Sequence, residues 1–443
     1  MTADWLRLSG AELGRRIGAG KINAVELTEA CLDAARAHPD QGRIYARMTE
    51  TRARTEALAA AARAKSGNRR GVLDGVPVSW KDLFDTAGVE TAAGSALLAG
   101  RVPAADAEVL RLATLGGLVC LGKTHMSELA FSGLGLNPVT ATPPCINNPA
   151  AVPGGSSSGA AASVAFGLAA AGIGSDTGGS VRIPAAWNDL VGLKTTSGRL
   201  SLHGVVPLCE RFDTVGPITR SIEDAAQLLA LLEGTKPADL RGANLNGVRL
   251  MVLDTLAMDG LRAEPASGFE SALARLAKAG ASITHRSVPV VTEAMGLAAI
   301  LFSSEAYATW RSVIETAPGK MFPRILERFR SGADFSAADY IAGWQRLHAL
   351  RAQWAAAVAG FDAVVLPTSP ILPPDAARLL SDTAYYVQEN LLALRNTRIG
   401  NLFGLCGLSL PTGTASAGIS LLCPPNAEEK LLRLGAAAEN CLQ

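Results

Sequence analysis

The sequence predicts an α/β fold in which helices cover both faces of a large mixed, mostly parallel, twisted sheet. From about residue 71 to the C-terminus, short apolar or β-branched runs alternate with helical patterns, which is typical of such sheets. Glycine is abundant, at 45 of 443 residues, and aromatic residues make up only 5%. The core must therefore consist of small aliphatic side chains that allow close packing between helices and sheet.

We expect a single domain, because neither an internal repeat nor a linker divides the chain. Its expected parts, in order, are N-terminal helices at 1–65, a central core at 66–225, a variable helical region that shapes a pocket at 226–345, and closing strands and a helix at 346–443. In the first part, Ser9 is a candidate cap for a helix over 11–17.

The apolar patterns place individual elements. Segments expected to be strands lie at 75–80, 118–121, 172–174, 248–253, 361–366, 404–413 and 417–423. Segments expected to be helical or mainly helical lie at 221–232, 266–280, 293–360 and 426–441, and the stretch 165–174 is expected to pass from helix to strand. The small apolar run at 160–173 is shorter than the roughly 20 residues that a membrane-spanning helix needs, so we expect it to be buried in the fold.

Charge excludes several classes of protein. The net charge is +1, which argues against nucleic-acid binding and against a polybasic membrane-surface protein. The N-terminus lacks the basic-then-apolar order of a signal peptide. We expect a cytoplasmic bacterial protein with no stable membrane insertion.

The seven cysteines are scattered, and none forms a C-x-x-C pair. This pattern indicates reduced thiols and gives no support for a zinc ribbon or a redox motif. We expect neither a metal nor a cofactor.

The first of two glycine–serine clusters spans Gly154 to Gly159. Its composition alone would suit a flexible linker, but Pro153 fixes its entry and a helical pattern follows directly. It also matches the G-x-S-x-G nucleophile elbow, although residues 147–153 do not form the strand that this motif requires. A P-loop has still less support, because the G-K-[ST] ending is missing.

The second cluster, Gly174 to Ser180, suggests a tight turn whose amides could stabilise an oxyanion. A serine at the end of such a turn needs a base, and no histidine lies nearby in the sequence. Lys81 follows an apolar run and is a candidate, because burial lowers the pKa of a lysine and makes the neutral amine available. Taken alone, Lys81 would also suit a solvated loop.

With these two clusters, the chain resembles the amidase signature family of serine hydrolases over roughly residues 5–440. The matching segments are 75–82, 122–128, 137–138, Pro149, 154–159, 174–184, 192–194, 367–370 and 407–411. The resemblance implies that Ser180 is the nucleophile, that Ser156, after a cis peptide bond to Gly155, bridges to it, and that Lys81 is the base. It further implies a Ser–cisSer–Lys triad that works through an acyl-enzyme.

The resemblance also assigns supporting residues. The oxyanion would be held by the amides of Thr177, Gly178, Gly179 and Ser180. The turn would be held by Asp176 and Arg182, although Arg182 is also a candidate to grip an acidic substrate. Ser157 and Ser158 would satisfy backbone or lysine groups. The candidate pocket residues are Trp80, Met126, Phe131, Ser132 and Cys209.

The expected substrate is a small neutral amide, aryl or aliphatic, with carbamates (urethanes) and esters open to the same acyl chemistry. The helical segment 295–345 carries an apolar stripe with few clustered charges, which is also typical of plain core and gives no sign of a site for a charged amino acid. We expect a monomer or homodimer with no nucleic-acid partner.

Three other interpretations remain open. A glutaminase subunit of a tRNA-dependent amidotransferase would need partner subunits. A catalytically silent binding protein would not need the three residues Lys81, Ser156 and Ser180. A membrane-associated fatty-amide hydrolase lacks support from any spanning or amphipathic segment.

Overall fold

A computed structural model describes residues 2–442 and contains the expected large mixed sheet covered by helices. The sheet has 11 strands in the order β1-β3-β2-β4-β6-β5-β10-β11-β9-β7-β8. The strands are β1 Tyr45–Met48, β2 Pro77–Lys81, β3 Val119–Thr124, β4 Ala171–Ser175, β5 Val191–Lys194, β6 Val215–Thr219, β7 Arg249–Leu253, β8 Ser282–Arg286, β9 Ala363–Pro367, β10 Cys406–Pro411 and β11 Gly418–Cys423.

Helices fill the intervals between most of these strands. They are α1 Thr2–Trp5, α2 Gly10–Gly18, α3 Ala24–Ala37, α4 Gln41–Ile44, α5 Glu50–Lys65, α6 Glu108–Leu115, α7 Ser158–Ala165, α8 Arg182–Trp187, α9 Ile222–Glu233, α10 Ala263–Lys278, α11 Val290–Gly296, α12 Ser304–Ile314, α13 Pro323–Arg330, α14 Ala337–Val358, α15 Ala376–Ser381, α16 Thr383–Leu402 and α17 Glu428–Leu442.

The sheet is less parallel than expected. Parallel pairing joins β3, β2 and β4 near one end and β8, β7 and β9 at the other. The strands between these groups pair antiparallel, through β6, β5, β10 and β11. The direction reverses because β5 and β6 are neighbours without a crossover helix between them, and because β10 and β11 form a hairpin.

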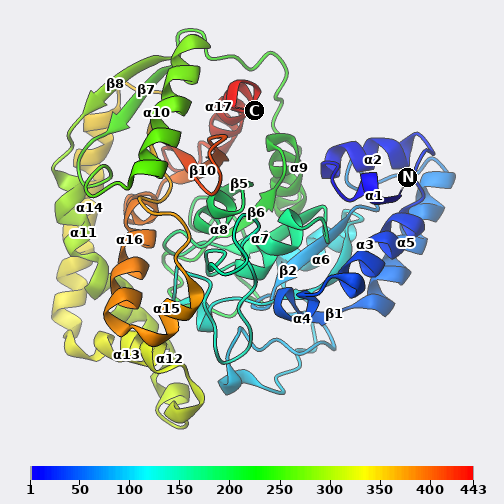
Figure 1. The fold of residues 1–443 in the computed structure, drawn as a ribbon, viewed down its shortest axis with the longest axis horizontal. Helices are drawn as coiled ribbons and strands as arrows, with labels where there is room; N and C mark the ends of the chain where they lie inside the picture. The colour runs from blue at the N-terminus through cyan, green and yellow to red at the C-terminus, as the bar shows by residue number, and fades with distance from the viewer. Residues whose placement is uncertain (1, 443) are drawn as a thin grey trace.

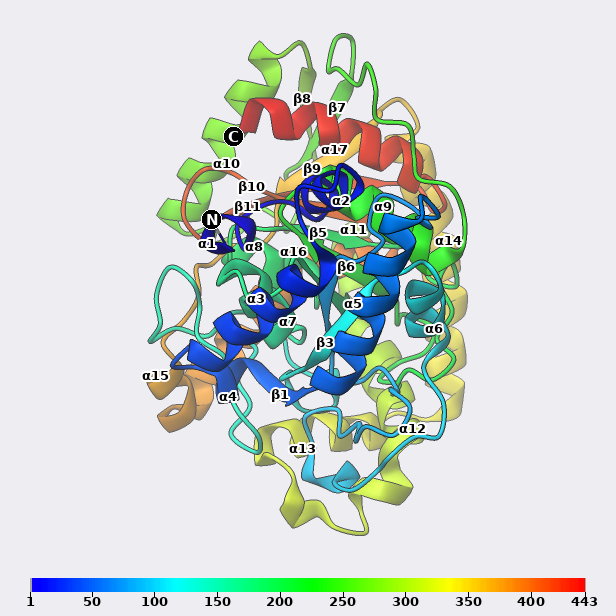
Figure 2. The same ribbon diagram turned by 90° about the vertical axis from the view of Figure 1, so that its right-hand side faces the viewer.

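The two faces of the sheet carry different helices. Val78 and Trp80 of β2 belong to the same apolar cluster as Leu27 of α3 and Ala57 of α5, and Figure 2 shows these two helices lying across β3. Helix α7 packs against β2, β3 and β4 from the other face, and α8 continues that layer against β5, β10 and β11. At the far end, α10 packs against β8 and β9, and α11 packs against α14 (Figure 1).

The predicted helices are confirmed where a capping serine precedes an apolar run. Ser9 caps α2, its hydroxyl accepting from the amide of Glu12 at 3.2 Å, and Ser221 caps α9 in the same way. The stretch 293–360 is mainly helical, as expected, and is divided among α11 to α14. Pro323 begins α13, and a capping box between Ser336 and Asp339 starts α14, so local start signals divide the stretch.

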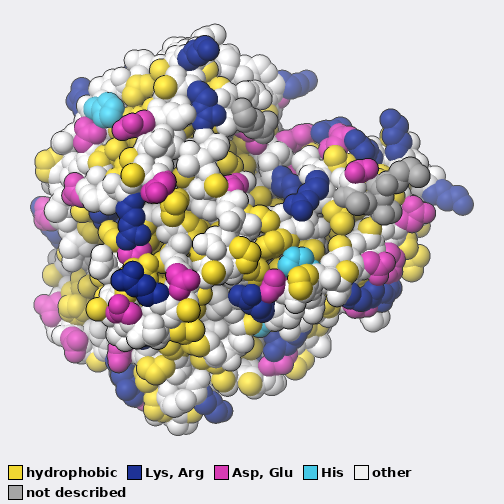
Figure 3. Space-filling view, in the orientation of Figure 1, with side chains coloured by type: hydrophobic (Ala, Val, Ile, Leu, Met, Phe, Trp, Pro, Cys, Tyr) yellow, Lys and Arg dark blue, Asp and Glu magenta, His cyan; other side chains and the backbone are white. Residues whose placement is uncertain are grey.

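The surface shows mixed charge. Basic and acidic side chains are interspersed over the face seen in Figure 3, in keeping with a net charge of +1. Within residues 2–442, no helix is both long and apolar enough to cross a bilayer.

Candidate active site

Lys81 lies at the carboxyl end of β2, with its amine inside the protein. Two residues earlier, and on the same side of the strand, the hydroxyl of Ser79 hydrogen-bonds that of Ser163 in α7 at 2.8 Å. The Lys81 side chain is fully buried, and its Nζ donates to the hydroxyls of Ser156 at 2.6 Å and Ser175 at 2.8 Å. The alternative of a solvated loop lysine is therefore wrong.

Burial changes the acidity of this amine. Loss of solvent lowers the pKa of Lys81 to about 7, although the charges of Asp213 and Asp176 act in the opposite direction. A large fraction of the Lys81 side chains is therefore neutral near pH 7, and a neutral amine has the lone pair that a base requires.

The Gly154–Gly159 cluster leads into α7 and is packed too tightly to be a linker. The Gly155–Ser156 peptide bond is cis, as the family resemblance implies. A Cβ on Gly155 would come within 2.6 Å of the Gly135 amide nitrogen and of Ser127 Oγ, so only glycine fits there. The Ser156 carbonyl accepts from the Ser127 amide at 3.2 Å, and the Gly155 amide donates to the Gly133 carbonyl at 2.8 Å, so the backbone is held on both sides of the cis bond.

The next residues of this cluster serve the backbone. The amide of Ser157 donates to the carbonyl of Ser180 at 3.2 Å and so ties the cluster to the nucleophile turn. The Ser157 hydroxyl donates to the carbonyl of Ser175 at 3.2 Å, and that of Ser158 donates to the carbonyl of His125 at 3.2 Å. The two serines were expected to satisfy either backbone groups or Lys81. Neither hydroxyl hydrogen-bonds Lys81, so both satisfy backbone groups.

Asp176 organises the turn that carries Ser180. Its carboxylate accepts from the amides of Gly179 at 2.8 Å and Val181 at 3.2 Å, and it forms a buried ion pair with Arg182. The Asn401 side chain of α16 donates to it as well, at 2.9 Å. Burial alone would raise the pKa of Asp176, but Arg182 holds it below its usual range. Arg182 is thus committed to the turn, which leaves it unsuited to gripping a substrate.

One of the four expected oxyanion donors is already occupied. The Gly179 amide donates to Asp176, and its direction is therefore fixed by the turn. Among the described residues, the amides of Thr177, Gly178 and Ser180 have no hydrogen-bond partner within the protein. These three are the donors free to meet a developing oxyanion.

Asp213 supports the turn from the loop before β6, a role that no sequence pattern indicated. It accepts from the Thr177 hydroxyl at 2.5 Å and from the amides of Leu208 at 2.9 Å and Cys209 at 3.1 Å. Ser175, the second partner of Lys81, was missed too. Its place directly before Asp176, at the end of a strand beside that of Lys81, is the signal that could have found it.

A small cavity adjoins Ser180. Its lining comprises Ala130, Phe131, Ser132, Thr177, Gly178, Ser180, Leu208, Phe302, Arg328, Leu394 and Arg398. Two of the five predicted pocket residues, Phe131 and Ser132, are among them. Trp80 is instead buried against Phe84, and Met126 and Cys209 are buried outside the lining, with Cys209 acting on the turn only through Asp213.

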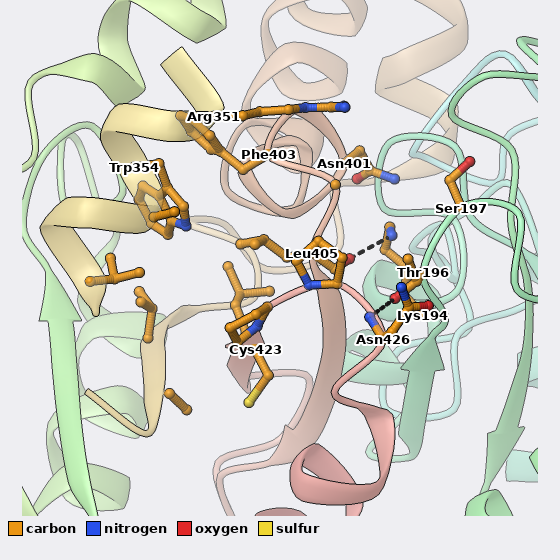
Figure 4. A pocket seen from close by; sticks show the side chains of 18 of the residues that line it. Lys194, Thr196, Ser197, Arg351, Trp354, Asn401, Phe403, Leu405, Cys423 and Asn426 are labelled. Atoms are coloured by element: carbon orange, nitrogen blue, oxygen red, sulfur yellow. Dashed lines mark hydrogen bonds between the residues drawn. The ribbon is translucent and has the colours of Figure 1, made fainter. Parts of the chain in front are cut away.

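A larger cavity lies away from Ser180. It has a volume of about 870 Å³ and contains aromatic groups such as Trp354 and Phe403 (Figure 4). Its wall includes Lys194, which donates to the carbonyl of Leu405 at 2.8 Å, and Asn401. None of Lys81, Ser156 and Ser180 lines it, so its size alone does not make it the reaction site.

The sequence and the fold match known proteins over nearly their whole length. The Amidase family model matches residues 26–432. The 2-amino-5-chloromuconic acid deaminase of Comamonas testosteroni is 35% identical, with 98% of this chain and 96% of the relative aligned. A glutamyl-tRNA(Gln) amidotransferase subunit from Anaeromyxobacter sp. (strain K) is 33% identical over the same shares. A crystal structure of an amidase superposes with a TM-score of 0.89 at 29% identity, covering 98% of this chain and 100% of that one.

Proposed function

The chain belongs to the Amidase family of carbon–nitrogen hydrolases, and from that premise we propose that it cleaves a small linear amide through an acyl-enzyme on Ser180. The observation that carries this proposal is the buried contact of 2.6 Å between Lys81 Nζ and Ser156 Oγ, beside a turn with free amides. A nucleophile, a relay and a base of lowered pKa are the groups that acyl transfer requires.

The reaction follows from these groups. Neutral Lys81 takes the proton of the Ser156 hydroxyl, Ser156 takes that of Ser180, and the Ser180 oxygen attacks the carbonyl carbon. The carbonyl π electrons move to the oxygen, where the amides of Thr177, Gly178 and Ser180 stabilise the charge. When the C–N bond breaks, the proton returns through Ser156 to the leaving nitrogen. Water then hydrolyses the ester on Ser180, and the same steps would cleave a carbamate or an ester.

The lining of the Ser180 cavity bears on the charge of the substrate. Phe131, Leu208 and Leu394 supply apolar walls suited to the expected neutral amide, but two arginines open onto the same space. The relative named for a deaminase acts on 2-amino-5-chloromuconic acid, which is itself an acid. A substrate panel should therefore contain acids as well as neutral amides.

A glutaminase subunit is the second candidate, because a glutamyl-tRNA(Gln) amidotransferase subunit is related over 98% of this chain. Glutamine carries an α-ammonium group as well as a carboxylate. The residues that line the Ser180 cavity include no aspartate or glutamate to meet that ammonium. This favours a substrate other than glutamine.

The test uses the purified full-length chain. A fluorophosphonate probe should label Ser180, and Ser180→Ala should lose both labelling and turnover of every amide in the panel. The exposed Ser197 provides a control, since Ser197→Ala should keep both. Amide turnover by the Ser180→Ala protein would overturn the mechanism, and turnover of glutamine alone would favour the second candidate.

A further inference from the structure

Two arginines stand where the Ser180 cavity joins a larger one. Arg328 of α13 and Arg398 of α16 line the small cavity at Ser180. They also line a neighbouring cavity of about 580 Å³, and Phe302 is the third residue common to both. A molecule that reaches Ser180 from the larger cavity therefore passes the two guanidinium groups.

Arg398 lies directly over the nucleophile turn. A Cβ built on Gly178 would be 3.5 Å from Arg398 Cγ and 3.9 Å from its Nε. Within residues 2–442, the Arg398 side chain has neither an ion pair nor a hydrogen bond, and it is only partly buried, so its donors are open to the cavity. Burial, with a smaller contribution from the charge of Arg328, lowers the pKa of Arg398 to about 9.

The guanidinium of Arg328 makes only one hydrogen bond within the described residues. Its Nη1 donates to the carbonyl of Phe131 at 2.8 Å, and its guanidinium lies 4.3 Å from the centre of the Phe131 ring. No carboxylate among the described residues pairs with it. The ring and the single bond fix the group in place and leave further N–H donors unused.

Other arginines of the region are satisfied within the protein. Arg182 pairs with Asp176, and Arg324 donates to two backbone carbonyls and to Thr383. Arg395, one turn before Arg398, donates to Asn396 and to the carbonyl of Ala257. The larger cavity also contains the exposed Glu327, which forms no ion pair in the described part of the chain. Arg398 thus differs from these neighbours in making no hydrogen bond within the described residues, and Arg328 differs in making only one, to the carbonyl of Phe131.

We propose that Arg398 and Arg328 form a carboxylate-binding site beside Ser180, and that the substrate is a small amide that carries its own carboxylate. Two partly desolvated cations without a counter-ion are unfavourable unless a ligand supplies the charge. A carboxylate matches the planar donors of a guanidinium and accepts from both at once. This inference rests on the proposed function, because it assigns the substrate of the same site.

The experiment compares matched substrates on the full-length enzyme. Succinamate, the half-amide of succinic acid, is paired with neutral succinamide, and N-acetylglycine with neutral N-acetylglycinamide. The wild-type enzyme should show a kcat/KM at least about tenfold higher for the acid of one pair, as loss of a charged hydrogen bond implies. Succinamate carries its carboxylate on the acyl part, and N-acetylglycine carries it on the amine. The pair in which the acid is preferred therefore shows on which side of the scissile bond the carboxylate binds.

The variant Arg398→Gln should lower kcat/KM for the preferred acid by about 10- to 100-fold and leave the neutral partner within about threefold. Arg328→Gln should act in the same direction. Arg395→Gln is the matched control, because Arg395 is on the same helix, lines only the outer cavity, and should leave the preference unchanged. Faster turnover of both neutral amides by wild type, or equal losses in the Arg398 and Arg395 variants, would overturn the proposal.

A second measurement needs no turnover. Succinate should slow the labelling of Ser180 by a fluorophosphonate in the wild-type enzyme and not in Arg398→Gln, whereas butyramide should act equally on both. Equal protection by succinate in the two proteins would contradict the carboxylate site. Failure of the probe to label wild type at all would contradict the proposed function instead, so the two failures are distinguishable.

Discussion

The amine of Lys81 is buried away from solvent and donates hydrogen bonds to the hydroxyls of Ser156 and Ser175. Burial lowers its pKa to about 7, which places its titration in the range where enzymes are usually assayed. The protonated amine cannot accept a proton from Ser156, whereas the neutral amine can. The activity of this site should therefore be present above pH 7 and decline as the pH falls through that value.

The rate of Ser180 labelling by a neutral fluorophosphonate should rise with pH, with a midpoint near 7 set by Lys81, and then level off. Below the midpoint we expect about a tenfold loss for each pH unit, as for a single titrating base. Lys81→Ala should lower the plateau by about 10²- to 10⁴-fold and abolish the step. A flat wild-type profile across the pH range on both sides of that midpoint would refute this role for the lysine.

Among the elements, the nucleophile turn depends on a glycine that faces α16. Gly179 has φ of +137°, a conformation that favours glycine. A Cβ there would come within 2.1 Å of Thr397 Oγ1 and 2.7 Å of Thr397 Cβ. Thr397 cannot easily move away, because its hydroxyl donates to the carbonyl of Gly178 at 2.7 Å and its branched side chain is on a buried helix face.

Gly179→Ala should therefore destabilise the protein by roughly 1–3 kcal/mol through overpacking, and should slow Ser180 labelling as well. Gly178→Ala is the matched control for stability, since its nearest new contact would be an ordinary 3.5 Å. It should stay within about 1 kcal/mol of wild type. Denaturant unfolding of the three proteins measures both effects, and equal midpoints for all three would show that the turn tolerates a side chain.

Whether a site residue could be predicted depends on its distance along the sequence from the glycine–serine clusters. Ser156 and Ser180 belong to short glycine-rich segments whose own composition specifies their turns, so the motifs could identify them. Asp213 and Arg398 lie 36 and 218 positions after Thr177 and Ser180, respectively, and neither belongs to a motif. The pairing of the strands places Asp213 at the site, and the packing of α16 places Arg398 there. These contacts join residues far apart in the sequence, so no local pattern indicates them. For the same reason the segment 295–345, whose apolar stripe gave no sign of a site for a charged ligand, carries Arg328 in α13.

At the scale of the whole molecule, the site is assembled from both halves of the sequence. Strands β1 to β6 fill one part of the sheet and β7 to β11 the other, and they meet where β5 pairs with β10, Leu193 opposite Leu408. Helix α16 then reaches across this joint, so that Asn401 contacts Asp176 and Thr397 contacts the Gly178 carbonyl. The first half contains Lys81, Ser156 and Ser180 with Asp176 and Asp213, but α16, which also holds the nucleophile turn, belongs to the second half.

We therefore propose that the chain is one domain and expect it to unfold as a unit. In a denaturant titration, near-ultraviolet circular dichroism and Ser180 labelling should fall together in one transition, because exposing the β5 edge removes the support of the nucleophile turn. A fragment of residues 1–240, cut in an exposed loop after α9, should leave that edge unpaired and should neither fold nor be labelled. The intact chain, purified in parallel, is the control. Two separated transitions, or a folded and labelled 1–240 fragment, would show instead that the first half is an independent domain.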